Sequence, residues 1–301
     1  MELRHLQHFV ALSEEGSFTK AARRVHIVQS GLSTSIKELE QELGCRLVER
    51  TTRKVSFTES GKLFLQHARA TLAALHNGIQ EVQFQDGIIR GRLHLGILQS
   101  LRPYVDLPLL LRRFREVYPA VDVSVKALST DMIPALIRSG EVDVSFHAIV
   151  GRAKWPGVQV IPYAHDFLVA VCARGHSLEA AKSVSLRRLA EEMFVDVTPD
   201  RALRRLVDQV FGQANLTRNT AFQVSDIPTA LQFVQHGLGV AVIPSALARS
   251  FATTGEIVTI KLRAESPAIP KWRIAVVRKP RQKTQLGKTT ADLLLEILNE
   301  M

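Results

Sequence analysis

Residues 17–43, SFTKAARRVHIVQSGLSTSIKELEQEL, predict two short helices joined by a tight turn. In the second helix four aliphatic residues recur at helical spacing and form one stripe that must be buried: Leu32, Ile36, Leu39 and Leu43. The opposite face carries short hydrogen-bonding side chains and one cation, which suit a helix in the major groove of DNA. The candidate DNA-contacting residues on this face are Gln29, Ser30, Ser33, Thr34 and Lys37.

The first helix of this pair is expected from Phe18 to about Val25, with Ser17 as its N-cap. Ala21 and Ala22 are small enough to let the second helix cross closely, as a helix-turn-helix requires. The same pattern also fits a helical hairpin in an ordinary core, because motif matches include false positives. The residues that follow are needed to distinguish a helix-turn-helix from a helical hairpin.

Residues 46–58, RLVERTTRKVSFT, predict two short strands around a basic turn, with Val55 and Phe57 alternating inward. A hairpin directly after a helix pair is typical of a winged helix. Arg50, Arg53 and Lys54 suit contacts with phosphates and with the narrow minor groove, although a solvated charged loop is the alternative.

Residues 1–15 predict a helix that covers the other two. His5 and His8 lie three residues apart on it and are expected at the surface. Two histidines without a third ligand do not define a metal site, so no metal site is predicted.

The N-terminal sequence resembles the winged helix of the LysR-type transcriptional regulators. The resemblance rests on Leu3, Phe9, residues 16–22 (GSFTKAA), residues 28–30 (VQS), Leu32, Ser33, Ile36, Leu39, Glu40, Leu43, Gly44, Leu47, Arg50 and residues 58–61 (TESG). Gly31 stands where alanine is common and lowers helix propensity by about 1 kcal/mol. The resemblance implies a regulator that binds double-stranded DNA and leaves RNA polymerase open as a further partner.

The net charge of the chain does not by itself indicate that it binds nucleic acid. The chain has a net charge of +10, but residues 1–90 carry 12 Lys+Arg and 10 Asp+Glu, a net of only +2. The DNA-binding prediction therefore depends on where the basic residues lie in the sequence and not on the net charge. No stretch approaches 18 apolar residues and residues 1–5 lack a signal-peptide core, so a cytoplasmic protein without a membrane partner is expected. Cys45 and Cys172 are expected as reduced, buried thiols in different domains.

Residues 58–86 predict one long helix with Thr58 as its N-cap. Apolar residues spaced 3, 4, 3, 4 and 3 apart form a heptad seam that is expected to pair with the same helix of a second copy. The predicted dimerisation residues are Leu65, Ala68, Leu72, Leu75, Ile79 and Val82. Packing of this helix on its own chain is the alternative. Dimerisation would place two reading helices about 34 Å apart on a dyad-symmetric site.

Beyond residue 90, short apolar strands alternate with helices, which predicts a mainly parallel sheet covered on both faces. Residues 225–244 repeat the cap, helix, glycine and strand order of residues 130–146, so two α/β subdomains with a cleft are expected. This region resembles the effector-binding domain of the same regulators, itself similar to periplasmic solute-binding proteins. The expected fold is thus multidomain: an all-α winged helix-turn-helix domain (1–58), a linker helix and hinge (59–90), and an α/β effector domain (91–301), with subdomains 91–162 plus 268–301 and 163–267.

Polar side chains lie where predicted strands end or helices begin, which is where ligands bind in open α/β sheets. The resemblance also implies that such positions line an inducer pocket. The candidate effector contacts are Gln99, Ser100, Ser129, Thr130, His147, Thr198 and Ser225. Helix capping is the alternative role for the serines and threonines. A small carboxylate is the expected inducer class.

The resemblance further implies a homodimer that assembles into a homotetramer. No cofactor and no catalytic residue are predicted, because the sequence shows no Gly-rich phosphate loop, nucleophile elbow or metal-ligand spacing. Two other functions stay open at this point: a receptor-like solute-binding protein, and a DNA-binding protein that needs no inducer.

Overall fold

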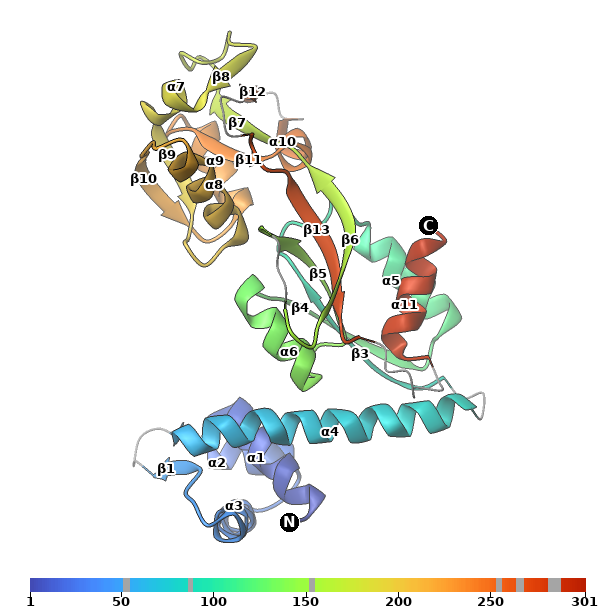
Figure 1. The fold of residues 1–301 in the computed structure, drawn as a ribbon. Helices are drawn as coiled ribbons and strands as arrows, with labels where there is room; N and C mark the ends of the chain where they lie inside the picture. The colour runs from blue at the N-terminus through green and yellow to red at the C-terminus, as the bar shows by residue number, and fades with distance from the viewer. Residues whose placement is uncertain (51–54, 86–88, 152–154, 253–255, 264–267, 281–287) are drawn as a thin grey trace.

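The computed structural model describes residues 1–301 except 51–54, 86–88, 152–154, 253–255, 264–267 and 281–287. A helical N-terminal domain is followed by one long helix and then by an α/β domain of two subdomains (Figure 1). Among the described helices, none is long and apolar enough to cross a membrane.

The N-terminal domain packs three helices and a two-stranded hairpin around one core. Its elements are α1 (Leu3–Glu15), α2 (Phe18–Arg24), α3 (Gln29–Leu43), β1 (Val48–Arg50) and β2 (Val55–Phe57). The α3 stripe is confirmed, since Leu32, Ile36 and Leu39 are fully buried. Ser17 caps α2 as predicted, its hydroxyl accepting the Lys20 N–H at 3.5 Å.

The long helix α4 (Glu59–Gln85) begins against the hairpin. The Thr58 hydroxyl caps it by accepting the Gly61 N–H at 2.9 Å. Gly61 lies so close to the hairpin that a Cβ there would be 2.1 Å from the Leu47 carbonyl oxygen. The start of α4 is therefore fixed to the N-terminal domain by direct backbone contact.

The heptad seam of α4 divides into two halves. Ala68 is 1% exposed in the core of its own N-terminal domain, and Leu65 and Leu72 are partly buried against the same core. These residues pack within the chain, which differs from the predicted seam between two copies. Leu75 and Ile79 are 43% and 48% exposed, whereas the side chain of Val82 lies outside the described residues.

Subdomain I is a five-stranded sheet of order β4-β3-β5-β13-β6. Its elements are β3 (Gly91–Ile97), α5 (Leu107–Val117), β4 (Val121–Ala127), the 3-10 turn η1 (Thr130–Met132), α6 (Ile133–Ser139), β5 (Val144–Ile149), β6 (Gln159–Asp166), β13 (Trp272–Arg278) and α11 (Thr290–Asn299). Strands β4, β3 and β5 run parallel, but β13 is antiparallel to both β5 and β6. The sheet is therefore mixed, because β13 returns from the other subdomain.

Subdomain II contains two sheets, of orders β11-β7-β12-β8 and β10-β9. Its elements are β7 (Leu168–Ala173), β8 (Ser183–Ser185), α7 (Leu186–Ala190), β9 (Met193–Val197), α8 (Ala202–Gln213), β10 (Asn219–Val224), α9 (Ile227–Gln235), β11 (Ala241–Pro244), α10 (Ser245–Ala252) and β12 (Ile257–Arg263). A bridge between Phe194 and Val240 joins the two sheets. Gly239 allows this contact, since a Cβ there would lie 2.5 Å from the Met193 carbonyl oxygen.

Asp166 fastens the two subdomains where β6 passes into β7. Its buried carboxylate accepts hydrogen bonds from the Tyr104 hydroxyl (2.9 Å), the Ser245 hydroxyl (2.6 Å) and the Ala246 N–H (2.8 Å). Although burial opposes ionisation, these donors lower the pKa of Asp166. One carboxylate thus binds a side chain of subdomain I and the start of α10 in subdomain II.

Candidate functional site

The polar face of α3 is open to solvent. Gln29, Ser30, Thr34 and Lys37 are exposed and Ser33 is partly exposed, all opposite the buried leucine and isoleucine stripe. No side chain caps the start of α3, where Val28 is the N-cap residue. The N–H groups of its first turn are therefore available to a phosphate.

Two residues beside this face were not predicted as candidates. Val28 is 70% exposed immediately before Gln29, and an apolar side chain in the major groove can contact a thymine methyl group. Arg46 lines one shallow groove together with Lys37. The exposure of Val28 has no sequence signal, because a valine next to a helix is ordinarily expected inside.

The wing hairpin has the predicted pairing. Strands β1 and β2 are antiparallel, with Val48 opposite Phe57 and Arg50 opposite Val55. The side chain of Arg50, and Arg53 and Lys54 altogether, lie outside the described residues. Their role at phosphates stays a prediction.

The histidines and cysteines differ in part from expectation. His5 is buried rather than at the surface, because it packs between helices with its Nε2 3.3 Å from the Glu38 carboxylate. Cys45 is exposed rather than buried, while Cys172 is buried as expected. Burial, together with Glu179 and Glu192, raises the pKa of Cys172 to about 11. Among the described residues no three potential ligands cluster around a metal position.

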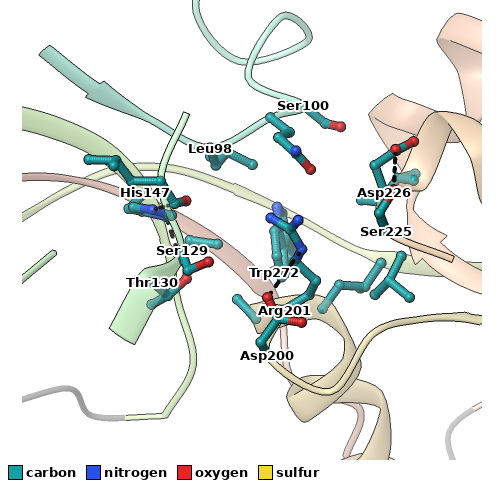
Figure 2. Close-up of a pocket in the computed structure, with 17 residues that line it drawn as sticks. Leu98, Ser100, Ser129, Thr130, His147, Asp200, Arg201, Ser225, Asp226 and Trp272 are labelled. Carbon is teal, nitrogen blue, oxygen red and sulfur yellow. Dashed lines mark hydrogen bonds and ion pairs between the residues drawn. The ribbon is translucent and has the colours of Figure 1, made fainter. Parts of the chain in front are cut away.

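A cleft lies between the two subdomains at the ends of their strands. Counting the part open to solvent, the space between its walls is about 480 Å³. Six of the seven predicted effector residues line it: Gln99, Ser100, Ser129, Thr130, His147 and Ser225. Figure 2 shows Ser129 and Thr130 across from Ser225 and Asp226. The six residues therefore lie together at one cleft, and their contact with an effector stays a prediction.

Thr198 is the exception and does not line the cleft. Its hydroxyl bonds to the Asp200 carboxylate and lowers the pKa of that group, while its carbonyl accepts the Arg201 N–H at 3.0 Å. Thr198 therefore shapes the turn before α8. At the start of α9, Asp226 is the cap and accepts the Thr229 N–H at 2.8 Å.

His147 is buried at one wall of the cleft. Its Nε2 lies 3.1 Å from the Leu128 carbonyl oxygen, which can only accept, so Nε2 carries the proton. Nδ1 is left as an acceptor 3.5 Å from the Thr130 hydroxyl. Burial lowers the pKa of His147 to about 4, and the ring is neutral at physiological pH.

Arg201 and Trp272 also line the cleft and were not predicted. The side chain of Arg201 is 25% exposed and extends into the middle of the cleft (Figure 2). Its Nε is buried without a hydrogen-bond partner among the described residues and forms an ion pair with the Asp200 carboxylate, whose oxygen is 3.6 Å away. The Trp272 Nε1 is a second buried donor without a described partner. Two cleft residues therefore each have an N–H that lacks an acceptor.

Two family models match the chain and together span most of it. The model described as "Bacterial regulatory helix-turn-helix protein, lysR family" matches residues 3–62, and "LysR substrate binding domain" matches residues 87–299. The second match alone covers more than half of the chain. The chain belongs to the LysR family. It is a ligand-responsive, DNA-binding transcriptional regulator of that family.

Relatives of this LysR-type regulator agree with that assignment. It is 29% identical over 280 residues to the HTH-type transcriptional regulator AlsR of Bacillus subtilis, covering 88% of each chain. It is 30% identical over 249 residues to the DNA-binding transcriptional dual regulator OxyR of Escherichia coli, covering 81% of this chain and 79% of that one. Both of these relatives are transcriptional regulators.

Solved structures of full-length regulators show the same fold. Full-length OxyR from Pseudomonas aeruginosa matches with a TM-score of 0.74 at 22% identity, covering 100% of this chain and 94% of that one. Full-length CbnR complexed with its target DNA matches with a TM-score of 0.66 at 23% identity, covering 100% and 99%. The predicted architecture of winged helix, linker helix and two-subdomain effector domain is therefore confirmed.

Proposed function

We propose that this LysR-type regulator reads a dyad-symmetric promoter site with two copies of α3 and responds to a small carboxylate bound in the cleft. Gln29, Ser30, Ser33 and Thr34 face the bases, while Lys37 and the wing cations contact phosphates. The exposed Leu75 and Ile79 pair α4 with a second copy, and two dimers form a tetramer. The protein acts in the cytoplasm at promoters, where RNA polymerase is a further partner.

The carboxylate proposal rests on the Arg201 Nε–H and the Trp272 Nε1–H, which have no hydrogen-bond acceptor among the described residues, although the Arg201 Nε is ion-paired with Asp200 at 3.6 Å. A buried N–H without an acceptor is costly, and most such groups in proteins are paired. A carboxylate supplies several acceptor positions and forms strong charge-assisted hydrogen bonds with a guanidinium. Apolar walls then hold the rest of the molecule, supplied by Leu98, Leu128, Val197, Leu203 and Ile227.

The charges around Arg201 limit the charge of the ligand. Asp200 and Asp226 both interact electrostatically with Arg201. Hydrogen bonds and burial have the larger effects on the pKa of each carboxyl, and the Arg201 charge lowers that pKa further. Further negative charge beside two carboxylates is unfavourable. A monocarboxylate therefore fits better than a phosphate or a polyanion.

A thermal-shift panel tests the carboxylate proposal. The full chain is melted with small aliphatic, aromatic and amino-acid carboxylates and with the matching neutral amides. We expect at least one carboxylate to raise Tm while its amide does not, since a ligand at 100 times its Kd stabilises by about 2.7 kcal/mol. Arg201→Met should abolish the shift.

The control is Arg187→Met, which removes an exposed arginine of α7 that does not line the cleft. It should retain the full shift. An unchanged shift in Arg201→Met, equal shifts by acids and amides, or no shift across the panel would contradict the carboxylate proposal. The last result would favour a regulator that acts without such an inducer.

A further inference from the structure

The η1–α6 unit (residues 130–139) extends from the cleft to the long helix α4. Its first residue, Thr130, lines the cleft, and α6 packs against α4 (Figure 1). Ile133 and Ile137 of α6 are fully buried in a small core with Val142 and Val277. These two isoleucines fix the short helix to that core, and closely packed interiors transmit strain.

The end of this unit contacts α4 directly. Gly140, the left-handed C-cap of α6, approaches α4 so closely that a Cβ there would lie 2.3 Å from the Ala73 Cβ. Arg69 of α4 donates to the Glu141 carboxylate at 3.1 Å. The Ser139 hydroxyl donates to the same carboxylate oxygen at 2.9 Å, which fixes Glu141 to the end of α6.

Arg69 extends this contact to the DNA-binding domain. Its second terminal nitrogen donates to the Ser13 hydroxyl at 3.3 Å and lies 3.9 Å from the Glu14 carboxylate, both on α1. The Arg69 side chain is only 22% exposed. One guanidinium therefore joins α1, α4 and the effector domain.

The beginning of the unit is linked across the cleft to subdomain II. Arg205 of α8 donates to the Asp131 carboxylate of η1 at 2.9 Å, and also to the Asp200 carbonyl at 3.1 Å. Arg205 is one turn along α8 from Arg201, the proposed ligand contact. A movement of α8 toward a bound ligand therefore acts on η1.

We propose that the η1–α6 unit couples closure of the cleft to the DNA-binding domain, with Asp131–Arg205 as the input contact and Glu141–Arg69 as the output contact. Arg69 and Glu141 are positioning residues, since neither lines the cleft or belongs to α3. The inference rests on the proposed function in assigning the cleft to the effector. Energetic coupling through such a chain requires that a change at one contact alters the other, which is measurable without a ligand.

Hydrogen–deuterium exchange of the full chain, without DNA or effector, tests the coupling by a double-mutant cycle. Arg205→Met removes the input contact and Glu141→Gln removes the charge of the output contact. In the parent background, Arg205→Met should raise exchange several-fold in peptides covering residues 66–75 of α4. In the Glu141→Gln background it should add nothing to those peptides.

Further variants control for the loss of any surface arginine and for unfolding of the domain. Arg112→Met removes an exposed arginine of α5 whose partner, Glu116, lies one turn away at 3.6 Å, and it should leave α4 unchanged. If Glu141→Gln unfolds the domain, the cycle is repeated with Arg69→Lys, which should retain the response in part, and Arg69→Met, which should lose it.

An equal increase in both backgrounds, or no increase in either, would overturn the coupling. Because the experiment uses no ligand, a negative result here is distinguishable from failure of the carboxylate panel.

Discussion

The protonation of His147 gives the effector domain a predicted pH dependence. Burial lowers its pKa to about 4 from an ordinary 6.5, so the unfolded chain binds the proton first. The stabilising contribution is complete above pH 6.5 and is lost as pH falls toward 4. A shift of this size corresponds to a loss of up to about 3 kcal/mol.

Urea unfolding at pH 7 and pH 4.5, followed by tryptophan fluorescence, measures this effect. Trp155 and Trp272 both lie in the effector domain and report on its unfolding. His147→Gln should lose less stability at pH 4.5 than the parent. Asp143, whose pKa burial raises to about 6, opposes the trend because its protonated form favours folding, but it is common to both proteins. Parallel pH profiles would contradict the prediction.

At the scale of single residues, the sequence indicated the cleft but not its main cation. Ser100, Ser129, Thr130 and Ser225 stand at strand ends or helix starts, and that local position is readable from the chain. Arg201 is one of three arginines at the start of α8, and only packing separates their roles. Arg204 donates to Asp208 at 2.9 Å, whereas the Arg201 Nε, 3.6 Å from the Asp200 carboxylate, has no hydrogen-bond partner among the described residues. Trp272 is the first residue of β13, and no local sequence pattern indicates that this strand borders the cleft.

At the scale of elements, two glycines of α4 provide a matched pair. Gly61→Ala places a Cβ 2.1 Å from the Leu47 carbonyl oxygen, and the clash can be relieved only by moving backbone. Gly78→Ala meets nothing within 4 Å. We expect Gly61→Ala to destabilise the N-terminal domain by a few kcal/mol, and Gly78→Ala to stabilise the helix by up to about 1 kcal/mol.

Thermal unfolding followed by circular dichroism measures both variants in the same helix. If the two substitutions changed Tm alike, the close packing of α4 on the hairpin would be wrong.

Helices were easier to predict than strand pairing. The period of the α3 stripe and the Ser17 cap of α2 are local features that can be read from neighbouring residues. Strands β8, β9, β10 and β12 were not predicted. β8 has only three residues, and β10 and β12 carry polar residues on exposed faces, as in Asn219–Val224, whereas β9 is mostly buried and apolar and was overlooked. The return of residues 268–301 to the first subdomain was predicted, but the antiparallel direction of β13 was not, because pairing direction depends on where the chain returns.

At the scale of the whole molecule, Leu75 and Ile79 carry the proposed dimer seam. The other described apolar positions of the heptad pack within the chain, a division that spacing alone could not show. Leu75→Lys with Ile79→Lys should weaken self-association, measured by sedimentation equilibrium over a concentration series. Leu63→Lys, which changes an exposed leucine of the same helix outside the seam, is the control and should associate like the parent. Unaltered association of the double variant would place the dimer contact elsewhere.

The regulator account as a whole is tested most directly by a quantitative DNase I footprint on the DNA flanking its own gene, with and without the carboxylate that raises Tm. We expect one dyad-symmetric protected segment whose pattern changes when the carboxylate is added. Ser33→Ala should alter base preference, and Arg50→Met should weaken binding to all DNA and reduce its salt dependence. Protection without dyad symmetry, protection that the carboxylate leaves unchanged, or a uniform loss in both variants would contradict the account.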